Sequence, residues 1–225
     1  MSIVEVKNIK RNYQQGEHVV RALQGVDLKI ETGEFTALMG PSGSGKTTLL
    51  NIIGGLDKPS EGNVNIDGQN LSSLSSGELS DLRLHKLGFV FQAYNLIPVL
   101  TAYENTEFVL LLQGKTANKE KVIQTLHSVG LEGMENRRPS ELSGGQQQRV
   151  AVARAIVGDP ILILADEPTA NLDSKTGYAL IDLMKDLNEK HGVTFVFSTH
   201  DPKVKESAKR IVELEDGMII KDSTQ

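Results

Sequence analysis

The sequence predicts an α/β fold built on a mixed, mainly parallel sheet. Two apolar runs, Ile161–Ala165 and Thr194–Ser198, are typical of parallel strands that are covered on both faces. A helical pattern around Tyr178–Leu187 lies between them and completes a β-α-β unit. The glycine-rich segment Gly40–Thr47 directly follows the apolar segment Phe35–Met39, which indicates a strand, a loop and a helix in that order.

Further strands are predicted on either side of this glycine-rich segment. Two short strand-like segments, Ile3–Ile9 and Val26–Ile30, open the chain, and Glu31–Glu34 forms a turn before the first buried strand. Gly62–Gly68 alternates apolar and polar residues and predicts another short strand. Leu87–Phe91 predicts a core strand that ends at Gln92.

The segment from Gln92 to about Pro160 has a helical pattern. Its last helix carries an apolar stripe and ends at Gly158-Asp159-Pro160, because glycine follows the helix end and proline cannot continue it. The stripe consists of Val150, Ala153, Ile156 and Val157. A hairpin-like segment, Ile211–Ile220, closes the chain with Asp216-Gly217 as its turn.

The composition limits the class of protein. The 225 residues are 39% apolar and 24% charged, which predicts a globular chain of ordinary type. No cysteine is present, which excludes disulfides, thiolate zinc sites and cysteine nucleophiles. The formal net charge of -5 argues against a broad nucleic-acid-binding surface, so no nucleic acid partner is expected. No stretch approaches the ~18 apolar residues that span a bilayer, so we expect no direct membrane insertion.

The glycine-rich segment is a phosphate-binding loop of the P-loop NTPase type. Its backbone N–H groups can surround the phosphates of ATP at a helix N-terminus. Lys46 reaches the β/γ oxygens, Thr47 offers a hydroxyl to Mg²⁺, and Thr48 can hydrogen-bond an α-phosphate oxygen. The predicted loop consists of Gly40, Pro41, Ser42, Gly43, Ser44 and Gly45.

An acidic pair follows the strand Ile161–Ala165. Asp166 is therefore placed at the carboxyl edge of the parallel sheet, beside the phosphate loop, where it can hold Mg²⁺ through water. Glu167 can orient an attacking water as a general base. Acidic pairs at strand ends also serve as helix caps, so the pair alone leaves both interpretations open.

A second phosphate-binding element lies at Ser143–Gln146. Ser143 resembles the N-cap of a helix starting near Gln146, and Gly144 and Gly145 leave N–H groups free at its positive end. One ATP has a single γ-phosphate, which the first loop already holds. We therefore predict a homodimer with ATP, in which each chain presents this turn to the nucleotide on its partner's Lys46 loop.

This combination of motifs resembles the ATP-binding subunits of ATP-binding-cassette (ABC) transporters over essentially the whole chain. The resemblance implies an ABC ATPase fold with an N-terminal antiparallel β part and an inserted helical subdomain. It implies a single domain, 1–225, in which 1–92 and 160–225 form the nucleotide-binding core and 93–159 the helical subdomain. The matching positions are Tyr13, Gly40–Thr48, Gln92, Leu142–Gln146, Asp166-Glu167, Asn171–Asp173 and His200.

The resemblance also implies roles for individual residues. Tyr13 is implied to stack on adenine, and Gln92 to contact Mg²⁺ and the attacking water. His200 is implied to contact the γ-phosphate and the catalytic water, and Asp173 to act across the dimer interface. The family more often has serine where this chain has Asn171, and this small departure is not expected to affect catalysis.

Two segments, Gly88–Asn105 and Asn136–Ser143, are similar to the branch of lipoprotein-release, macrolide-export and cell-division ATPases. This similarity implies integral-membrane permease subunits as partners and a cytoplasmic position, peripheral on the inner face of the cell membrane. Leu96–Leu100 is then expected to contribute to a groove that receives a permease helix.

Two other functions share these motifs. A nucleic-acid-linked ATPase of the chromosome-maintenance kind usually carries long coiled-coil, zinc or tandem-cassette additions, none of which fits in 225 residues. A regulatory ATPase that recruits partners at the division site remains open, because the same branch contains such proteins. GTPases and small-molecule kinases fit less well, because neither explains Leu142–Gln146.

Overall fold

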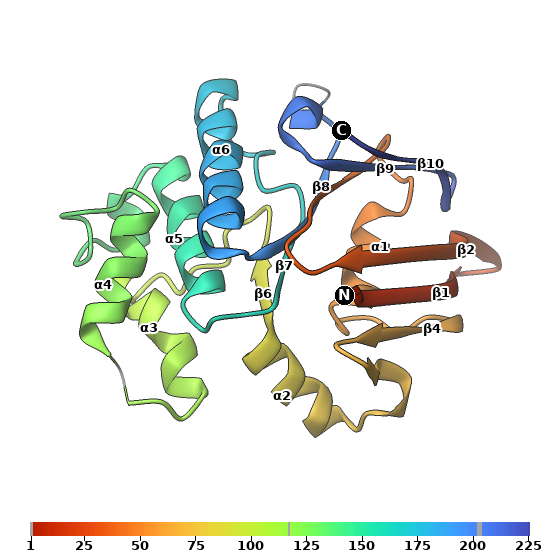
Figure 1. Ribbon diagram of the computed structural model, residues 1–225, viewed down its shortest axis with the longest axis horizontal. Helices are drawn as coiled ribbons and strands as arrows, with labels where there is room; N and C mark the ends of the chain where they lie inside the picture. The colour runs from red at the N-terminus through yellow and green to blue at the C-terminus, as the bar shows by residue number, and fades with distance from the viewer. Residues whose placement is uncertain (1, 117, 202–203) are drawn as a thin grey trace.

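A six-stranded sheet forms the centre of the structure, which is a computed structural model that describes residues 2–116, 118–201 and 204–225. The strand order is β10-β9-β3-β8-β7-β6, and every neighbouring pair is parallel except β10 and β9. The mixed, mainly parallel core sheet is thus as predicted (Figure 1). Its strands are β3 (Phe35–Met39), β6 (Leu87–Val90), β7 (Leu162–Ala165), β8 (Thr194–Thr199), β9 (Arg210–Glu215) and β10 (Met218–Thr224).

The central strands are buried on both faces. Every residue of β3, β7 and β8 is buried, as their continuous apolar sequences predict. Alternate side chains enter two hydrophobic clusters: Phe35 and Phe195 belong to one, and Leu38 and Val196 to the other. The first cluster lies under α5 (Gly144–Ile156) and α6 (Ser174–His191), and the second under α1 (Lys46–Ile53). The sheet is therefore covered by helices on both faces (Figure 1).

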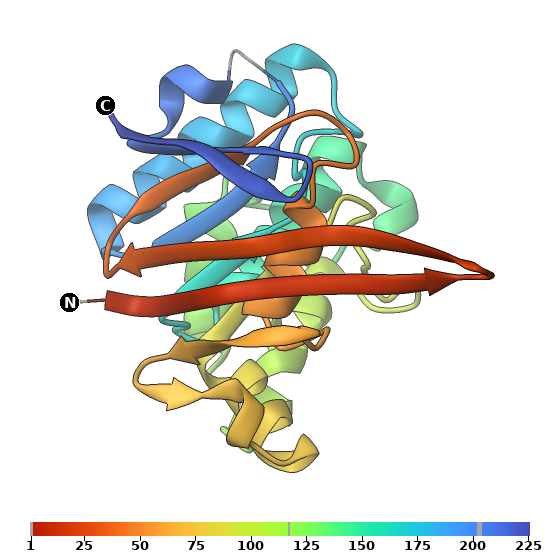
Figure 2. The same cartoon turned by 90° about the vertical axis from the view of Figure 1, so that its right-hand side faces the viewer.

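A four-stranded antiparallel sheet packs beside α1, in the order β2-β1-β4-β5. Its first two strands form a hairpin that extends past the other strands (Figure 2). The two short segments expected here are in fact strands of 14 residues each. The outer half of the hairpin is exposed and polar, so it lacks the alternation that marks a half-buried strand. The strands are β1 (Ser2–Gln15), β2 (His18–Glu31), β4 (Glu61–Ile66) and β5 (Gln69–Asn70).

One helix, α2 (Ser76–Lys86), is absent from the sequence prediction. Its only buried residue is Leu82, so it has almost no apolar stripe. Its start does carry a signal, since Ser75 and Glu78 form a capping box in which each side chain bonds the other's backbone N–H. The motif Ser-x-x-Glu is therefore the feature that predicts this helix.

The segment between β6 and β7 is helical, as predicted. It contains α3 (Ala102–Leu112), α4 (Lys119–Ser128), a short 3₁₀ turn at Pro139–Glu141 and α5. Two further 3₁₀ turns lie elsewhere in the chain, at Leu71–Ser73 and Val204–Ser207. Helix α5 begins at Gly144, two residues earlier than expected. Among the described residues, none of the helices is long and apolar enough to cross a membrane.

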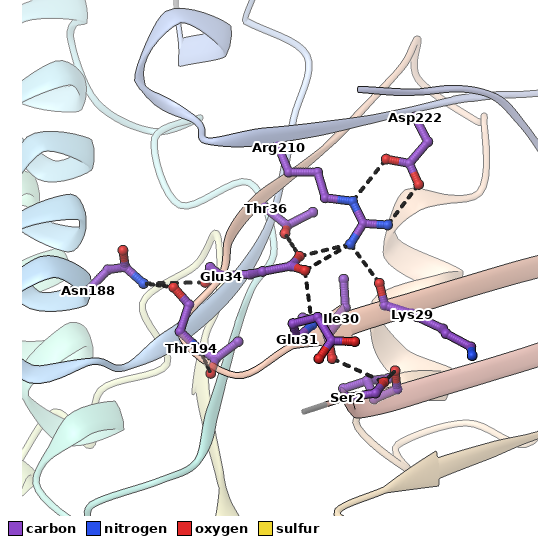
Figure 3. A network of polar contacts seen from close by, with 12 residues as sticks. Ser2, Lys29, Ile30, Glu31, Glu34, Thr36, Asn188, Thr194, Arg210 and Asp222 are labelled. Atoms are coloured by element: carbon purple, nitrogen blue, oxygen red, sulfur yellow. Dashed lines mark hydrogen bonds and ion pairs between the residues drawn. The ribbon is translucent and has the colours of Figure 1, made fainter. Parts of the chain in front are cut away.

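A charged network joins the amino ends of β3 and β9 (Figure 3). The guanidinium of Arg210 donates to Glu34 at 2.8 Å, to Asp222 at 2.7 Å and to the carbonyl of Lys29 at 2.7 Å. Next to it, the amide of Asn188 donates to the carbonyls of Gly33 at 2.8 Å and Val193 at 2.7 Å. The network ties the β2–β3 turn to α6 and to the terminal hairpin, which fixes the end of the sheet opposite the phosphate loop.

Candidate functional site

The phosphate loop connects β3 to α1 in a conformation that requires glycine. Gly40 has φ 150° and Gly45 has φ 103°, which lie in the region that favours glycine. A Cβ at Gly40 would lie 2.1 Å from the carbonyl oxygen of Leu214, and one at Gly45 would lie 2.6 Å from that of Ala22. The loop is therefore packed against β9 and β2, and its path is fixed by close backbone approach.

Two polar side chains of this loop are buried. Lys46 is 4% exposed, and its ammonium donates to the carbonyls of Gly40 at 2.8 Å and Pro41 at 2.9 Å. The hydroxyl of Ser44 is also buried and has no hydrogen-bond partner among the described residues. An unsatisfied buried hydroxyl is costly, so a ligand with acceptor oxygens would stabilise the loop. Ser42 and Thr47 are exposed beside it, and Thr48 is half-buried.

Asp166 lies at the centre of a short chain of hydrogen bonds. The hydroxyl of Thr47 donates to its Oδ1 at 3.0 Å, and the hydroxyl of Ser198 donates to the same oxygen at 2.7 Å. The backbone N–H of Glu167 donates to the Ser198 hydroxyl at 2.8 Å. The structure thus brings together Thr47 of α1, Ser198 of β8 and the acidic pair Asp166-Glu167 that follows β7. Oxygen ligands of this kind suit Mg²⁺.

Glu167 is held beside His200 in an unusual conformation. Its carboxylate lies 3.0 Å from Nδ1 of His200, and its backbone has φ 43°, a left-handed value that a non-glycine residue rarely adopts. Both residues border a hollow of about 170 Å³ that also contacts Thr199 and Leu172. Strain of this kind clusters at functional sites, where the surrounding structure holds a side chain in a required place.

Gln92 lies two residues after β6, in a loop beside these carboxylates. The amide of Asn171 donates to the backbone carbonyl of Gln92 at 2.9 Å. The backbone N–H of Asp166 donates to the carbonyl of Val90, the last residue of β6, at 2.9 Å. The loop that carries Gln92 therefore begins at the end of β6, next to the end of β7, where Asp166 and Glu167 lie.

The turn at Ser143 is an N-cap, as predicted, and Gln146 completes it as a capping box. The N–H of Ser143 donates to the Gln146 side chain at 2.9 Å, and the N–H of Gln146 donates back to the Ser143 hydroxyl at 3.3 Å. A Cβ at Gly145 would lie 2.4 Å from Cγ2 of Thr176, and one at Gly144 would lie 2.9 Å from the hydroxyl of Tyr94. The two glycines thus have a packing role inside one chain.

Asp173 caps α6 and is fixed by Thr176. It accepts from the Thr176 backbone N–H at 3.1 Å and from its hydroxyl at 2.6 Å. Hydrogen bonds from the Thr176 side chain and backbone hold the pKa of Asp173 below its ordinary value. The carboxylate is therefore ionised near neutral pH and remains at the surface.

Tyr13 projects from the exposed half of β1 and is held by two neighbours. Its hydroxyl donates to Asp57 at 2.7 Å, and the guanidinium of Arg11 lies 4.4 Å from the ring centroid. Arg11 also donates to Asp57, at 2.8 Å and 2.9 Å. The ring is therefore fixed in orientation while 36% of the residue stays exposed.

The predicted site residues form two groups in one chain. Lys46, Thr47, Asp166, Glu167 and His200 are connected near the carboxyl edge of the sheet. Within the described residues, no hydrogen bond or ion pair joins Ser143–Gln146 to the phosphate loop. A single chain therefore presents two predicted phosphate-binding elements that do not contact each other by polar interactions.

Comparison with known proteins identifies the family. A family model described as "ABC transporter" matches residues 23–170. The chain belongs to the ABC transporter family. It is 48% identical, over 96% of its own length and 95% of the relative's, to the uncharacterized ABC transporter ATP-binding protein MJ0796 of Methanocaldococcus jannaschii. This ABC chain is an ATPase subunit, as its motifs predict.

Two further similarities concern fold and context. The dimeric structure of a post-hydrolysis state of MJ0796 bound to ADP and Pi superimposes with a TM-score of 0.90, at 47% identity and 98% coverage of both chains, which confirms the ABC ATPase fold. The macrolide export ATP-binding/permease protein MacB of Mannheimia succiniciproducens is 45% identical over 99% of this ABC chain. The chain spans only about a third (35%) of that relative's length.

Two residues with contacts in this site, Ser198 and Arg154, are missing from the sequence prediction, and Asn171 is matched to the family without a structural role. Ser198 joins Asp166 to Glu167, and its only signal is a hydroxyl at the end of an apolar strand next to the acidic pair. Asn171 and Arg154 bond the loop that carries Gln92 through its backbone carbonyls. Contacts to a backbone carbonyl depend on the folded path of the loop, so no residue pattern reveals them.

Proposed function

We propose that this chain binds and hydrolyses ATP with Mg²⁺ as part of a homodimer, and that this cycle powers a separate integral-membrane permease of the lipoprotein-release or macrolide-export type. The observation that supports the proposal is that the glycine-rich loop before α1 and the Ser143 turn before α5, which we infer to bind phosphate, have no polar contact with each other in one ABC chain. Each element is ordered, and each suits the same ligand. Two chains placed head to tail would bring both elements to one nucleotide.

In this proposal the phosphate loop binds the β- and γ-phosphates of ATP. Its backbone N–H groups lie at the N-terminus of α1, and the Lys46 ammonium exchanges the carbonyls of Gly40 and Pro41 for phosphate oxygens. The buried Ser44 hydroxyl gains an acceptor. Tyr13, fixed by Asp57 and Arg11, supplies a flat surface for adenine.

Mg²⁺ fits the oxygen atoms beside this loop. Thr47 and Asp166 would hold it, with Gln92 at the edge of the site, and bound Mg²⁺ neutralises charge on the transferred phosphate. Ser198 keeps Oδ1 of Asp166 in place by its 2.7 Å hydrogen bond. Asp166 must therefore exchange or share its Thr47 contact when the metal binds.

Glu167 is the proposed general base for the attacking water. Its carboxylate is held by the left-handed backbone and by the contact with Nδ1 of His200. His200 keeps a side chain that is 62% exposed and can turn toward the γ-phosphate. A water between these groups would lose its proton to Glu167 as it attacks phosphorus.

The partner chain would complete each site with Ser143, Gly144, Gly145 and Gln146. These residues begin α5, whose N-terminus favours an anionic ligand, and their capping box keeps the turn rigid. Asp173 lies one helix away at the surface and would contact the partner across the interface. ATP bound at the interface would then hold the two chains together, and hydrolysis would allow the dimer to separate.

A surface hollow of about 410 Å³ supports the permease part of the proposal. It lies between α2, α3 and α5, and its lining includes Leu56, Leu84, Phe89, Asn95, Val109 and Arg154. Leu96–Leu100, which the sequence assigns to a groove that receives a permease helix, are not among the residues that line this hollow. Exposed Phe108, Leu111 and Leu112 on α3 add apolar surface nearby. A permease segment docked here would hold the chain at the inner face of the membrane.

Complementation tests the shared site. Lys46→Ala disables the phosphate loop, and Ser143→Arg blocks the Ser143 turn. A homodimer of either variant therefore has no complete site. A mixture of the two variants contains heterodimers with one complete site, and we expect it to regain up to roughly a quarter of the wild-type ATPase rate. Two folded variants whose mixture stays inactive would contradict a site shared between chains.

Affinity purification from detergent-solubilised membranes tests the partner. We expect tagged protein to recover an integral-membrane permease with a large extracytoplasmic domain, identified by mass spectrometry. Asn95→Arg, which places charge and bulk in the hollow, serves as the matched variant and should lose the permease while keeping ATP binding. Recovery of division or DNA-processing proteins alone would contradict the transport function and leave the ATPase intact.

A further inference from the structure

The loop 91–95, which carries Gln92, is strained and has little support from the sheet. Tyr94 has φ 59°, a left-handed value that costs about 1 kcal/mol in most non-glycine residues, and Asn95 has φ 50°, a value that asparagine adopts more readily. Its own backbone bonds are few: Tyr94 N–H donates to Phe91 at 3.2 Å and Asn95 N–H to Ala93 at 2.6 Å. Such a conformation persists only when neighbouring groups hold it.

Side chains of α5 hold one side of this loop. Arg154 donates to the carbonyl of Tyr94 at 2.8 Å and also to the carbonyl of Asn95. Gln148 donates to the carbonyl of Phe91 at 3.4 Å. These three carbonyls are therefore fixed to α5, whose N-cap is Ser143, but the carbonyl of Gln92 is not bonded from this side.

Asn171 holds the other side. Its amide donates to the carbonyl of Gln92 at 2.9 Å, and the hydroxyl of Tyr94 lies 3.5 Å from the carbonyl of Asn171. Asn171 is itself carried by consecutive tight turns, since Ala170 N–H donates to Glu167 at 3.1 Å and Leu172 N–H to Thr169 at 3.0 Å. The amide is thus presented from a segment whose position is fixed by Glu167.

We propose that Asn171 is a positioning residue for the hydrolysis reaction, which holds the main chain of Gln92 in register with Asp166 and Glu167. This inference rests on the proposed function, because it assigns Gln92 a part at the metal and water. Asn171 touches neither, and it acts only through Gln92. The contact also joins the Gln92 loop to the segment that ends in Asp173. If a permease segment in the hollow of about 410 Å³ moved the Gln92 loop, the Asp173 segment would therefore move with it.

The chemistry of the contact explains why an amide is used. A side-chain N–H₂ group can donate to a carbonyl at this distance while its own oxygen stays in water, whereas a carboxylate offers only acceptors. A serine is shorter, so its hydroxyl would not span the same gap without movement of one loop. Asn171→Asp therefore replaces an attraction by repulsion with almost no change in shape.

Hydrogen exchange tests the contact directly, without ATP. We expect peptides covering 91–95 to exchange faster in Asn171→Asp than in wild type, and peptides from β3 and β8 to be unchanged. Asn118→Asp is the matched control, because Asn118 is an exposed N-cap of α4 and aspartate caps equally well. Equal exchange of the 91–95 peptides in Asn171→Asp and wild type would overturn the proposal, whether or not the protein hydrolyses ATP.

A double-mutant cycle tests the role in catalysis. We expect Asn171→Asp to lower kcat about ten-fold while KM for ATP changes less than about two-fold, because displacement of a positioned group acts mainly on the chemical step. In a Gln92→Ala background the same change should lower kcat less than about two-fold. Asn171→Ala removes the donor without adding charge and should behave in the same way.

The outcomes separate this inference from the proposed function. An undiminished ten-fold loss in the Gln92→Ala background would overturn the positioning role, because Asn171 would then act on another group. A loss of thermal stability in place of the kcat effect would show that the contact serves only the fold. A wild-type protein without ATPase activity would contradict the proposed function, and the exchange experiment would still decide whether Asn171 holds the loop.

Discussion

The two ends of the central sheet carry polar networks that differ in how completely they are bonded. At the amino ends, Arg210 donates to Glu34, Asp222 and the Lys29 carbonyl, and only 17% of its side chain is exposed. Hydrogen bonds to Asp222 and Glu34 outweigh the effect of burial and hold the pKa of Arg210 above its ordinary value. This network is closed, because the Arg210 guanidinium is shared by the two carboxylates and the Lys29 carbonyl.

At the carboxyl ends, the network is open to solvent and to ligand. His200 has 62% of its side chain exposed beside Glu167, and Glu167 has a strained backbone. The Ser44 hydroxyl has no partner among the described residues. The two networks lie at opposite ends of the same pair of parallel strands, β3 and β8. The network at the amino ends stabilises the fold, and the network at the carboxyl ends keeps polar groups available for ATP.

The largest expected effect lies at the open end. Glu167→Gln should lower the ATPase rate by about 10²- to 10⁴-fold, because the amide cannot accept a proton from water. The free energy of unfolding should change little, since the amide oxygen can still contact His200. Steady-state ATPase assays measure the loss of rate. Because bound ATP is no longer hydrolysed, the variant should accumulate as an ATP-bound dimer, which size-exclusion chromatography with Mg-ATP detects.

A monomeric Glu167→Gln variant under saturating Mg-ATP would contradict the proposed dimer. Lys46→Ala provides the control, because it lacks the phosphate contact and should remain monomeric under the same conditions. A Glu167→Gln variant with undiminished hydrolysis would instead remove Glu167 from the general-base role.

The closed end should show the opposite pattern. Arg210→Met leaves Glu34 and Asp222 without their shared cation, and we expect the free energy of unfolding to fall by about 2 to 3 kcal/mol. The kcat for ATP should remain unchanged at temperatures where the variant is folded. Urea denaturation measures the loss, and Arg21→Met, on the exposed part of β2, is the matched control. An Arg210→Met variant with normal stability and a reduced kcat would contradict the conclusion that the network at the amino ends serves the fold and not catalysis.

Sequence reasoning predicted these ends unequally. The open end is built around the short contiguous motifs at Lys46 and Asp166, and His200 was added only through the resemblance to the family. The closed end joins Glu34 to Arg210, 176 residues away, and to Asp222 on the strand next to Arg210, and these three residues belong to no motif.

The same distinction explains the errors in the predicted fold. The buried strands were predicted, because continuous apolar runs mark them. The outer half of the β1–β2 hairpin and helix α2 were missed, because their polar surfaces carry no periodic signal and only the Ser75–Glu78 capping box remains. Ser198 was missed for a related reason: its role depends on the strand beside it.

Ser198 provides a smaller effect within the open end. Ser198→Ala removes the hydroxyl that bonds both Oδ1 of Asp166 and the backbone N–H of Glu167. We expect kcat to fall about ten-fold, and the free energy of unfolding to fall by about 1 kcal/mol because a partly buried N–H loses its partner. ATPase kinetics and urea denaturation report the two losses separately. Ser198→Thr, which keeps the hydroxyl, should retain more activity than Ser198→Ala.

The smallest expected effect is the pH dependence of the closed end. Hydrogen bonds from Arg210 hold the pKa of Asp222 below its ordinary value, which is about 3.9 in an unfolded chain. The unfolded chain therefore takes up the proton at a higher pH than the folded chain does. The contribution of Asp222 is complete above about pH 4 and is lost as the pH falls through the lower folded value. Because 41% of its side chain is exposed, solvent screening limits this contribution to about 1 kcal/mol or less.

Asp222→Asn isolates this contribution. The variant should be less stable than wild type at pH 7 and at pH 5 by the same amount, and the difference should shrink as the pH falls below about 4. Urea denaturation at several pH values measures it, with Asp186→Asn as the control, since Asp186 forms only an exposed pair with Lys190. A difference that grows toward acid would mean that Asp222 is protonated more easily in the folded chain, and the network at the amino ends would then be strained instead of closed.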